Sequence, residues 1–162
     1  MKINTIKVGM ADLNVTKAPH LLTTLGLGSC VGITLYDSIN KIAGLVHVML
    51  PSSKEIRNNQ NKAKFADTGI EELVKEMEKI GANRKNLIAK IAGGAQMFNF
   101  SSNNQMLNIG ERNVIATKEK LKELNIKLVS EDTGGNFGRT IILDSKDGSL
   151  YVRTIGHGEK VI

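Results

Sequence analysis

The segment from Cys30 to Pro51 constrains the fold more than any other part of the chain. Its first part, CVGITLYD, alternates in hydrophobic character and contains several β-branched residues, which favours a strand. A turn is predicted at residues 37–40, and KIAGLVHVML at residues 41–50 predicts a second strand that is stopped by Pro51. The two strands are therefore expected to form an antiparallel hairpin.

The rest of the chain predicts a mixture of helices and strands. Hydrophobic residues at helical spacing predict one helix that ends before Gly81. Thr68-x-x-Glu71 is a candidate capping box for its start, and a start nearer Ala63 is the alternative. A second helix is predicted over residues 111–124. Further strands are predicted at residues 86–94, 126–132, 139–144 and 149–155.

Strands come both before and between the helices, which favours a mixed or antiparallel sheet over a doubly wound parallel one. We therefore expect an α/β fold of the α+β type, with two main helices packed on the sheet. At 162 residues the chain is predicted to be a single domain, residues 1–162. Aromatic residues make up only 4% of the sequence, so the core must be mainly aliphatic.

Composition also bears on location and partners. One cysteine cannot form an internal disulfide, which suits a reducing compartment. The sequence has no secretory signal and no apolar run near the ~20 residues needed to span a bilayer, so we expect a cytoplasmic protein. The formal net charge is +6, but the lysines are scattered and alternate with glutamates. With few aromatic residues for base stacking, this pattern argues against specific nucleic-acid binding.

Two familiar site types are not supported by the residue spacing. Gly26-x-Gly28 resembles the start of a dinucleotide-binding fingerprint, but the third glycine, Gly32, comes one position late. A strand pattern follows it, where the fingerprint requires a helix N-terminus. One cysteine and three histidines show no paired metal-ligand motif, so we expect no structural zinc.

The sole cysteine offers two catalytic arrangements. Gly28-Ser29-Cys30-Val31-Gly32 fits a nucleophile elbow, with Asp132 or Asp144 and then His157 following in the required chain order. That elbow should lead into a helix, whereas a strand is predicted here, so this arrangement is the weaker alternative.

The second arrangement pairs Cys30 with His47, one on each strand of the hairpin. Side chains opposite one another in such a pair lie close enough for an imidazole to hold a sulfur as thiolate, its reactive form. The surrounding glycines would let a substrate approach and leave backbone N–H groups for an oxyanion. A buried lone cysteine and a core histidine remain the alternative interpretation from the residues alone.

Seven motifs along the chain then match a known family in order and spacing. The motifs are TLGLGSCV, HVMLP, KFADTGI, KIAGGAQMF, NIGERN, EDTGGNFGR and a final VR…G.GE. On these motifs the chain resembles the chemoreceptor glutamine deamidases, the CheD family of bacterial chemotaxis, from about Leu22 to Glu159. The sequence departs from the family pattern mainly at Phe65 and Phe137, and neither position is one of the matched catalytic residues.

The resemblance implies a fold, a reaction and partners. The fold would be a layered sandwich shared with glutamine-deamidating bacterial toxins. The reaction would be hydrolysis of glutamine side chains on methyl-accepting chemotaxis receptors to glutamate and ammonia, without metal or cofactor. The catalytic residues would be Cys30, His47 and Thr24, with a thioester on the cysteine and oxyanion support from the backbone near Gly28 and Ser29. The partners would be the receptors, the phosphatase CheC and, indirectly, phosphorylated CheY.

A non-enzymatic alternative stays open beside this interpretation. The chain could act mainly as a chemotaxis adaptor that engages CheC and receptors. The presence of all three matched residues favours the protein-glutamine glutaminase, because a pure binding module would be free to lose them.

Overall fold

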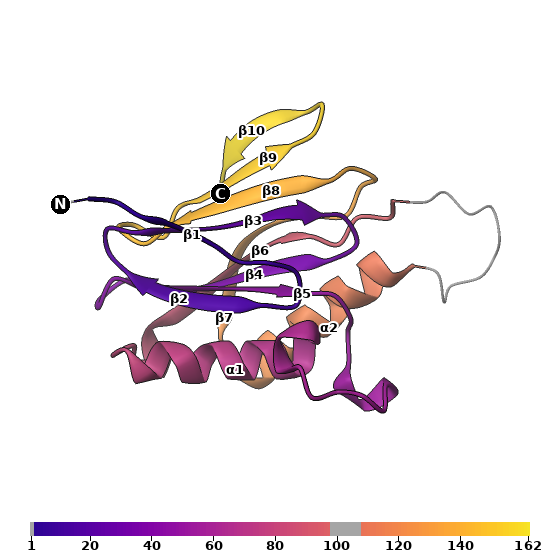
Figure 1. Ribbon diagram of the computed structural model, residues 1–162, viewed down its shortest axis with the longest axis horizontal. Coiled ribbons are helices and arrows are strands. Elements are labelled where there is room, and N and C mark those ends of the chain that lie inside the picture. The colour runs from indigo at the N-terminus through magenta and orange to yellow at the C-terminus, as the bar shows by residue number, and fades with distance from the viewer. Residues whose placement is uncertain (1, 98–107) are drawn as a thin grey trace.

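Residues 2–97 and 108–162 are described by a computed structural model, and over these residues two stacked sheets are covered on one outer face by two helices (Figure 1). The helices are α1 (Ala66–Lys79) and α2 (Ile109–Glu123), and short 3₁₀ turns lie at η1 (Ser53–Glu55), η2 (Lys62–Lys64) and η3 (Arg84–Asn86). The strands are β1 (Thr5–Lys7), β2 (Leu13–Lys17), β3 (Leu21–Leu27), β4 (Val31–Asp37), β5 (Ile42–Val48), β6 (Leu87–Gly93), β7 (Lys127–Thr133), β8 (Arg139–Asp144), β9 (Leu150–Thr154) and β10 (Gly158–Val161).

Both sheets are mixed. The first has the strand order β1-β3-β8-β9-β10, in which β1 and β3 are parallel and the other pairs are antiparallel. The second has the order β2-β5-β4-β6-β7, in which β6 and β7 are parallel and the other pairs are antiparallel. This arrangement confirms the predicted α+β class with two helices on a mixed sheet.

The predicted hairpin is confirmed and lies at the centre of the second sheet. β4 and β5 pair from Val31↔Val48 to Asp37↔Ile42, and every residue of both strands is buried. Burial on both faces follows from the layers, because one face of the hairpin meets the helices and the other meets the first sheet.

The two faces of the hairpin build two aliphatic cores. The core against the helices is formed mainly by alternate residues of the hairpin and the inner face of α1; it includes Val31, Ile33, Leu35, Val46, Val48, Ile70, Leu73, Val74 and Met77. The core between the sheets uses the opposite side of the hairpin; it includes Leu22, Leu27, Cys30, Tyr36, Leu45, Ile141, Leu143 and Val152. The sole cysteine therefore belongs to the layer between the sheets.

Several local features differ from the sequence predictions. The sequence patterns did not predict β1, β2 or β10. They also did not predict that the strands divide into two sheets. The capping box is wrong, because α1 begins after Phe65 without a side-chain cap, and Thr68 Oγ1 instead donates to the Lys62 carbonyl at 2.7 Å. The helix end is as predicted, with Gly81 at a φ of 111°. Neither described helix is long and apolar enough to cross a membrane.

Candidate active site

Three side chains predicted to act together are brought to the same layer of the fold. Thr24 lies on β3 of the first sheet, His47 on β5 of the second sheet, and Cys30 directly precedes β4. Thr24 and His47 are completely buried, and Cys30 is 7% exposed. The site is thus built across the two sheets rather than within one hairpin.

Thr24 fixes the orientation and the tautomer of His47. Its Oγ1 atom donates to the Val8 carbonyl at 2.6 Å and lies 2.7 Å from Nδ1 of His47. A hydroxyl has one proton, and a carbonyl oxygen can only accept. The proton on Thr24 is therefore directed at Val8, and the Nδ1–H group of His47 donates to the hydroxyl. In the neutral ring this leaves the lone pair on Nε2.

That second ring nitrogen is buried and, among the described residues, has no hydrogen-bond partner. Leaving a buried acceptor unpaired costs about 1–3 kcal/mol, so such groups are rare in folded proteins. His47 is therefore held with a free basic nitrogen inside the protein. This is the arrangement that a general base needs.

The strand register places Cys30 diagonally from His47. Gly32 is the residue directly opposite His47, and Cys30 precedes it by two positions on the same face of the strand. The sequence prediction that these two side chains face each other directly is therefore refined to a diagonal pair. Gly32 also allows the sheets to approach, because a Cβ atom there would lie 2.6 Å from Cδ1 of Ile141.

The backbone of the cysteine loop is fastened to the end of β6. The Cys30 carbonyl accepts from Gly94 N at 2.8 Å, and the Gly28 carbonyl accepts from Ala95 N at 2.9 Å. Gly93 has a φ of 113°, and a Cβ atom there would lie 2.3 Å from the Cys30 carbonyl oxygen. Only glycine fits this position, because any side chain would displace the loop that carries the thiol.

One predicted oxyanion donor is already engaged. The Gly28 N–H group donates to the Gly26 carbonyl at 3.1 Å, so it is not directed at a substrate. The expectation that Gly28 supports an oxyanion through its N–H is therefore corrected. Gly28 instead provides room, because a Cβ atom there would lie 3.0 Å from Cγ of Met97.

Burial favours the uncharged forms of both reactive side chains. Burial raises the pKa of the Cys30 thiol, and a hydrogen bond from its own backbone N–H lowers it by less. Burial also lowers the pKa of His47. A neutral thiol beside a neutral imidazole is thus favoured over the resting thiolate that the sequence led us to expect.

Comparison with known proteins identifies the family. Residues 49–154 match the family described as "CheD chemotactic sensory transduction". Proteins named "Probable chemoreceptor glutamine deamidase CheD" match over nearly the whole chain. The protein from Caldanaerobacter subterraneus subsp. tengcongensis is 65% identical over 162 residues, all of both chains. The chain belongs to the CheD family. The protein from Lachnoclostridium phytofermentans is 60% identical over 157 residues, 97% of this chain and 98% of the relative.

The competing elbow arrangement is not assembled in this CheD-family chain. Asp132 binds Arg139 and Lys160, whereas the ring of His157 packs on Phe137 with 4.5 Å between centroids. Asp144 lies at the other end of β8, paired with Leu21. Neither carboxylate is hydrogen-bonded to His157 among the interactions of the described residues, so this arrangement lacks the contacts of a triad.

Sequence reasoning missed a buried arginine next to the site. Arg139 is 2% exposed and pairs across the strands with Leu27. Its guanidinium binds Asp132 at 3.1 Å and donates to the Gly93 carbonyl at 3.3 Å. This residue therefore ties the first sheet to the β6 end that holds the Cys30 loop. The motif EDTGGNFGR contained both charged partners, but nothing in it predicted their pairing.

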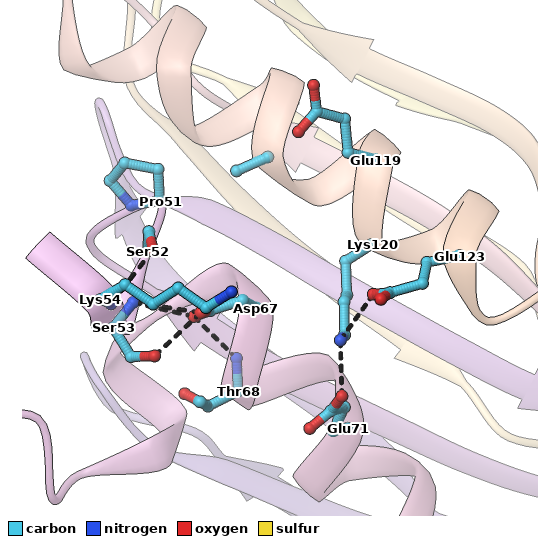
Figure 2. A pocket seen from close by; sticks show the side chains of 11 residues that line it. Pro51, Ser52, Ser53, Lys54, Asp67, Thr68, Glu71, Glu119, Lys120 and Glu123 are labelled. Carbon is cyan, nitrogen blue, oxygen red and sulfur yellow. Dashed lines mark hydrogen bonds and ion pairs between the residues drawn. The ribbon is translucent and has the colours of Figure 1, made fainter.

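A groove of about 570 Å³ lies elsewhere, between α1, α2 and residues 51–54 (Figure 2). Its charged groups are largely paired with one another: Lys120 contacts Glu71 and Glu123, and the Asp67 carboxylate accepts from Ser53. None of the three predicted catalytic residues lines it. Its contribution to the site is indirect, because the Asp67–Ser53 contact fixes the segment that follows β5.

Proposed function

We propose that this protein hydrolyses the side-chain amide of glutamine residues in methyl-accepting chemotaxis receptors, giving glutamate and ammonia. The reaction and substrate class are those in the names of its full-length relatives. The observation that carries the proposal for the site is the buried, unpartnered Nε2 atom of His47, a residue that lies diagonally across the paired strands from the only cysteine of the chain. Cys30 is assigned as the nucleophile, His47 as the general base and acid, and Thr24 as the residue that orients His47.

The first half of the reaction forms a thioester. As the Cys30 sulfur attacks the glutamine Cδ atom, Nε2 of His47 takes the thiol proton, and the carbonyl oxygen becomes an oxyanion. The backbone N–H group of Ser29 is assigned to that oxyanion, because the N–H groups of Gly28 and Cys30 contact the Gly26 carbonyl and the Cys30 sulfur. The intermediate collapses when Nε2–H protonates the leaving nitrogen, which releases ammonia and leaves a γ-glutamyl thioester.

The second half returns the free enzyme. A water molecule occupies the place of the departed ammonia, and Nε2 of His47 takes a proton from it as its oxygen attacks the thioester carbon. The carbon–sulfur bond then breaks, the sulfur regains the proton from His47, and the new glutamate side chain leaves. The hydroxyl of Thr24 keeps the same ring nitrogen directed at the reaction throughout, because its own proton is held by Val8.

The remaining assignments rest on the family resemblance. We place the protein in the cytoplasm, with the phosphatase CheC as a direct partner and phosphorylated CheY as an indirect one. The net charge of +6 fits a substrate rich in glutamate, since opposite charges accelerate encounter. The alternative function, a non-enzymatic adaptor for CheC and receptors, would use the same surfaces without the chemistry.

The deciding experiment measures ammonia release from a chemoreceptor cytoplasmic fragment by wild type and by Cys30→Ala. Mass spectrometry of the fragment locates the glutamines that become glutamate. Conversion by wild type alone supports the proposal, and conversion by Cys30→Ala removes Cys30 from the mechanism. If wild type binds the fragment or CheC without converting any glutamine, the adaptor function replaces the enzyme.

A further inference from the structure

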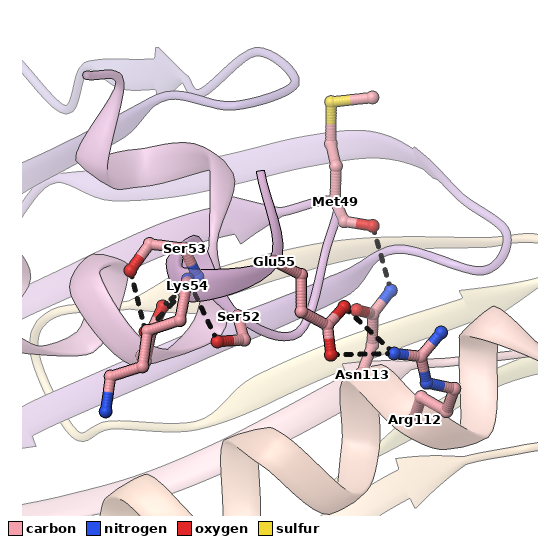
Figure 3. Close-up of polar contacts among 8 residues, drawn as sticks. Met49, Ser52, Ser53, Lys54, Glu55, Arg112 and Asn113 are labelled. Atoms are coloured by element: carbon pink, nitrogen blue, oxygen red, sulfur yellow. Dashed lines mark hydrogen bonds and ion pairs between the residues drawn. The ribbon is translucent and has the colours of Figure 1, made fainter. Parts of the chain in front are cut away.

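Asn113 connects the two segments that carry the cysteine and the histidine. It lies on α2 and is completely buried. Its Nδ2 atom donates to the Ser29 carbonyl at 2.9 Å and to the Met49 carbonyl at 3.0 Å. The second of these contacts is visible in Figure 3. Ser29 directly precedes Cys30, and Met49 follows His47 by two residues.

The chemistry of this contact fixes the side chain in one orientation. Both partners are carbonyl oxygens, which only accept, so the NH₂ group must face them. The Oδ1 atom is then left buried and, within the described part of the chain, without a partner. An unpaired buried oxygen is unfavourable, so the two bonds donated by Nδ2 are what hold the side chain in this place.

The two segments need such a connection because the hairpin ends before reaching them. The last paired residues of β4 and β5 are Val31 and Val48. Residues 29–30 and Met49 lie beyond that pair, where no ladder bond between the two strands sets their separation. On its other side Cys30 is held by Gly94. Asn113 supplies the missing contact on the side of β5.

The neighbouring residue on α2 reinforces the segment after β5 without touching the cysteine loop. Arg112 binds both carboxylate oxygens of Glu55 at 3.0 Å, on the exposed side of the same turn (Figure 3). This pair holds η1 in place and, among the hydrogen bonds and ion pairs of the described residues, does not involve Ser29. The α2 helix thus contributes a general anchor at Arg112 and a specific bridge at Asn113.

We propose that Asn113 is a positioning residue that sets the separation of the Cys30 thiol from Nε2 of His47. The inference rests on the proposed function, in which these two groups exchange a proton. Losing the bridge leaves both reactive side chains present but lets the loop before Cys30 move away from β5. Because proton transfer and attack depend on sub-ångström placement, the chemical step slows more than substrate binding.

The test replaces the amide by an apolar side chain of similar size, Asn113→Leu, and compares kcat and KM for the receptor fragment. We expect kcat to fall about tenfold or more while KM changes by less than about threefold. The pH at which Cys30 alkylation reaches half its maximal rate should fall toward the ordinary thiol value of about 8.5, because a displaced loop is less buried. A purely structural role would lower the melting temperature without changing kcat or this midpoint in the folded protein.

Thr117→Val is the matched control. Thr117 is also fully buried on α2, and its hydroxyl donates to the Asn113 carbonyl at 2.7 Å inside the helix. The substitution removes a buried hydrogen bond at nearly constant volume, one helical turn away, and touches neither Ser29 nor Met49. We expect kcat of this variant to stay within about twofold of wild type. Its alkylation midpoint should stay within a few tenths of a pH unit of the wild-type value.

The outcomes separate this inference from the proposed function. If Asn113→Leu keeps kcat within about twofold of wild type, or if Thr117→Val loses as much kcat at equal stability, the positioning role is wrong. Should the leucine variant fail to fold by circular dichroism, Asn113→Ala, assayed below its melting midpoint, decides by the same criterion. Activity in Cys30→Ala would instead contradict the site itself, whatever Asn113 does.

Discussion

The hydroxyl of Thr24 lies 2.7 Å from Nδ1 of His47 and joins the first sheet to the second inside the protein. A carboxylate in this place would both orient the imidazole and stabilise its charged form. A hydroxyl whose proton is held by the Val8 carbonyl does only the first. Because burial also lowers the pKa of His47, its imidazole is well oriented but weakly basic.

Thr24→Val should therefore slow deamidation without preventing folding. The substitution keeps the branched shape but removes the acceptor for Nδ1–H, so the tautomer and ring orientation of His47 are no longer fixed. We expect kcat to fall about tenfold to a hundredfold with little change in KM. Thr24→Ser, which keeps the hydroxyl, is the control and should retain most of the activity. Equal loss in both variants would contradict the orienting role.

The pKa shifts predict how Cys30 and His47 respond to pH. Burial raises the thiol pKa, so alkylation of Cys30 without substrate should reach half its maximal rate above the ordinary thiol value of about 8.5. Burial lowers the pKa of His47, so its imidazole stays neutral to a lower pH than an ordinary histidine. The value of kcat/KM should therefore be maintained below about pH 6.5. Iodoacetamide labelling across pH measures the response of Cys30, and ammonia release across pH measures the response of His47. A fast alkylation plateau already at pH 6 would indicate a resting thiolate–imidazolium pair instead.

The central hairpin could be predicted because its signals are local. The strand alternation and the turn after Asp37 lie within about twenty residues of sequence. Two of the unpredicted strands lack such a signal: β10, Gly158–Val161, is exposed at every residue, and β1, Thr5–Lys7, has only one partly buried residue. The division into two sheets was missed because the hairpin side that faces the first sheet carries small or polar residues such as Gly32 and Ala43, which do not form a hydrophobic pattern.

The site was predictable only as far as side-chain chemistry goes. Cys30 and His47 stand out in the sequence as candidates because few residue types can act as a nucleophile or a general base. The partners that position them do not, since Val8 acts through its carbonyl and Asn113 binds carbonyls 64 and 84 residues away. Backbone contacts of this kind depend on the tertiary fold and leave no spacing that a sequence pattern could reveal.

Gly93 should be among the least replaceable residues of the chain. Its φ of 113° strains any side chain, and an added Cβ atom would lie 2.3 Å from the Cys30 carbonyl oxygen. We expect Gly93→Ala to lower the free energy of unfolding by about 2–4 kcal/mol and to reduce activity further by displacing the cysteine loop. Gly134→Ala is the control, because its φ is 84° but nothing lies within 4 Å. It should show only the backbone cost of about 1–2 kcal/mol, with urea unfolding as the measurement. Equal losses would argue against a clash at Gly93.

Asp37, at the turn end of the hairpin, should govern acid stability without affecting catalysis. Burial alone would raise its pKa, but hydrogen bonds from Asn40, Asn83 and Asn86 outweigh burial and lower the pKa to about 2. The folded pKa is below the unfolded one, so the carboxylate stabilises the protein above about pH 4, and this stabilisation is lost as pH falls toward 2.

Asp37→Asn isolates that contribution. We expect it to lower the free energy of unfolding at pH 7 by on the order of 2 kcal/mol and to flatten the loss of stability between pH 4 and pH 2. Its kcat, measured while folded, should match wild type, because the residue pairs with Ile42 and Leu87 at the far end of both ladders from Cys30. Asp12→Asn, an exposed carboxylate that accepts from the adjacent Leu13 N–H, is the control and should follow the wild-type acid profile. Urea unfolding from pH 2 to pH 7 measures all three proteins. An acid profile of Asp37→Asn identical to wild type would show that this buried carboxylate does not carry the acid sensitivity.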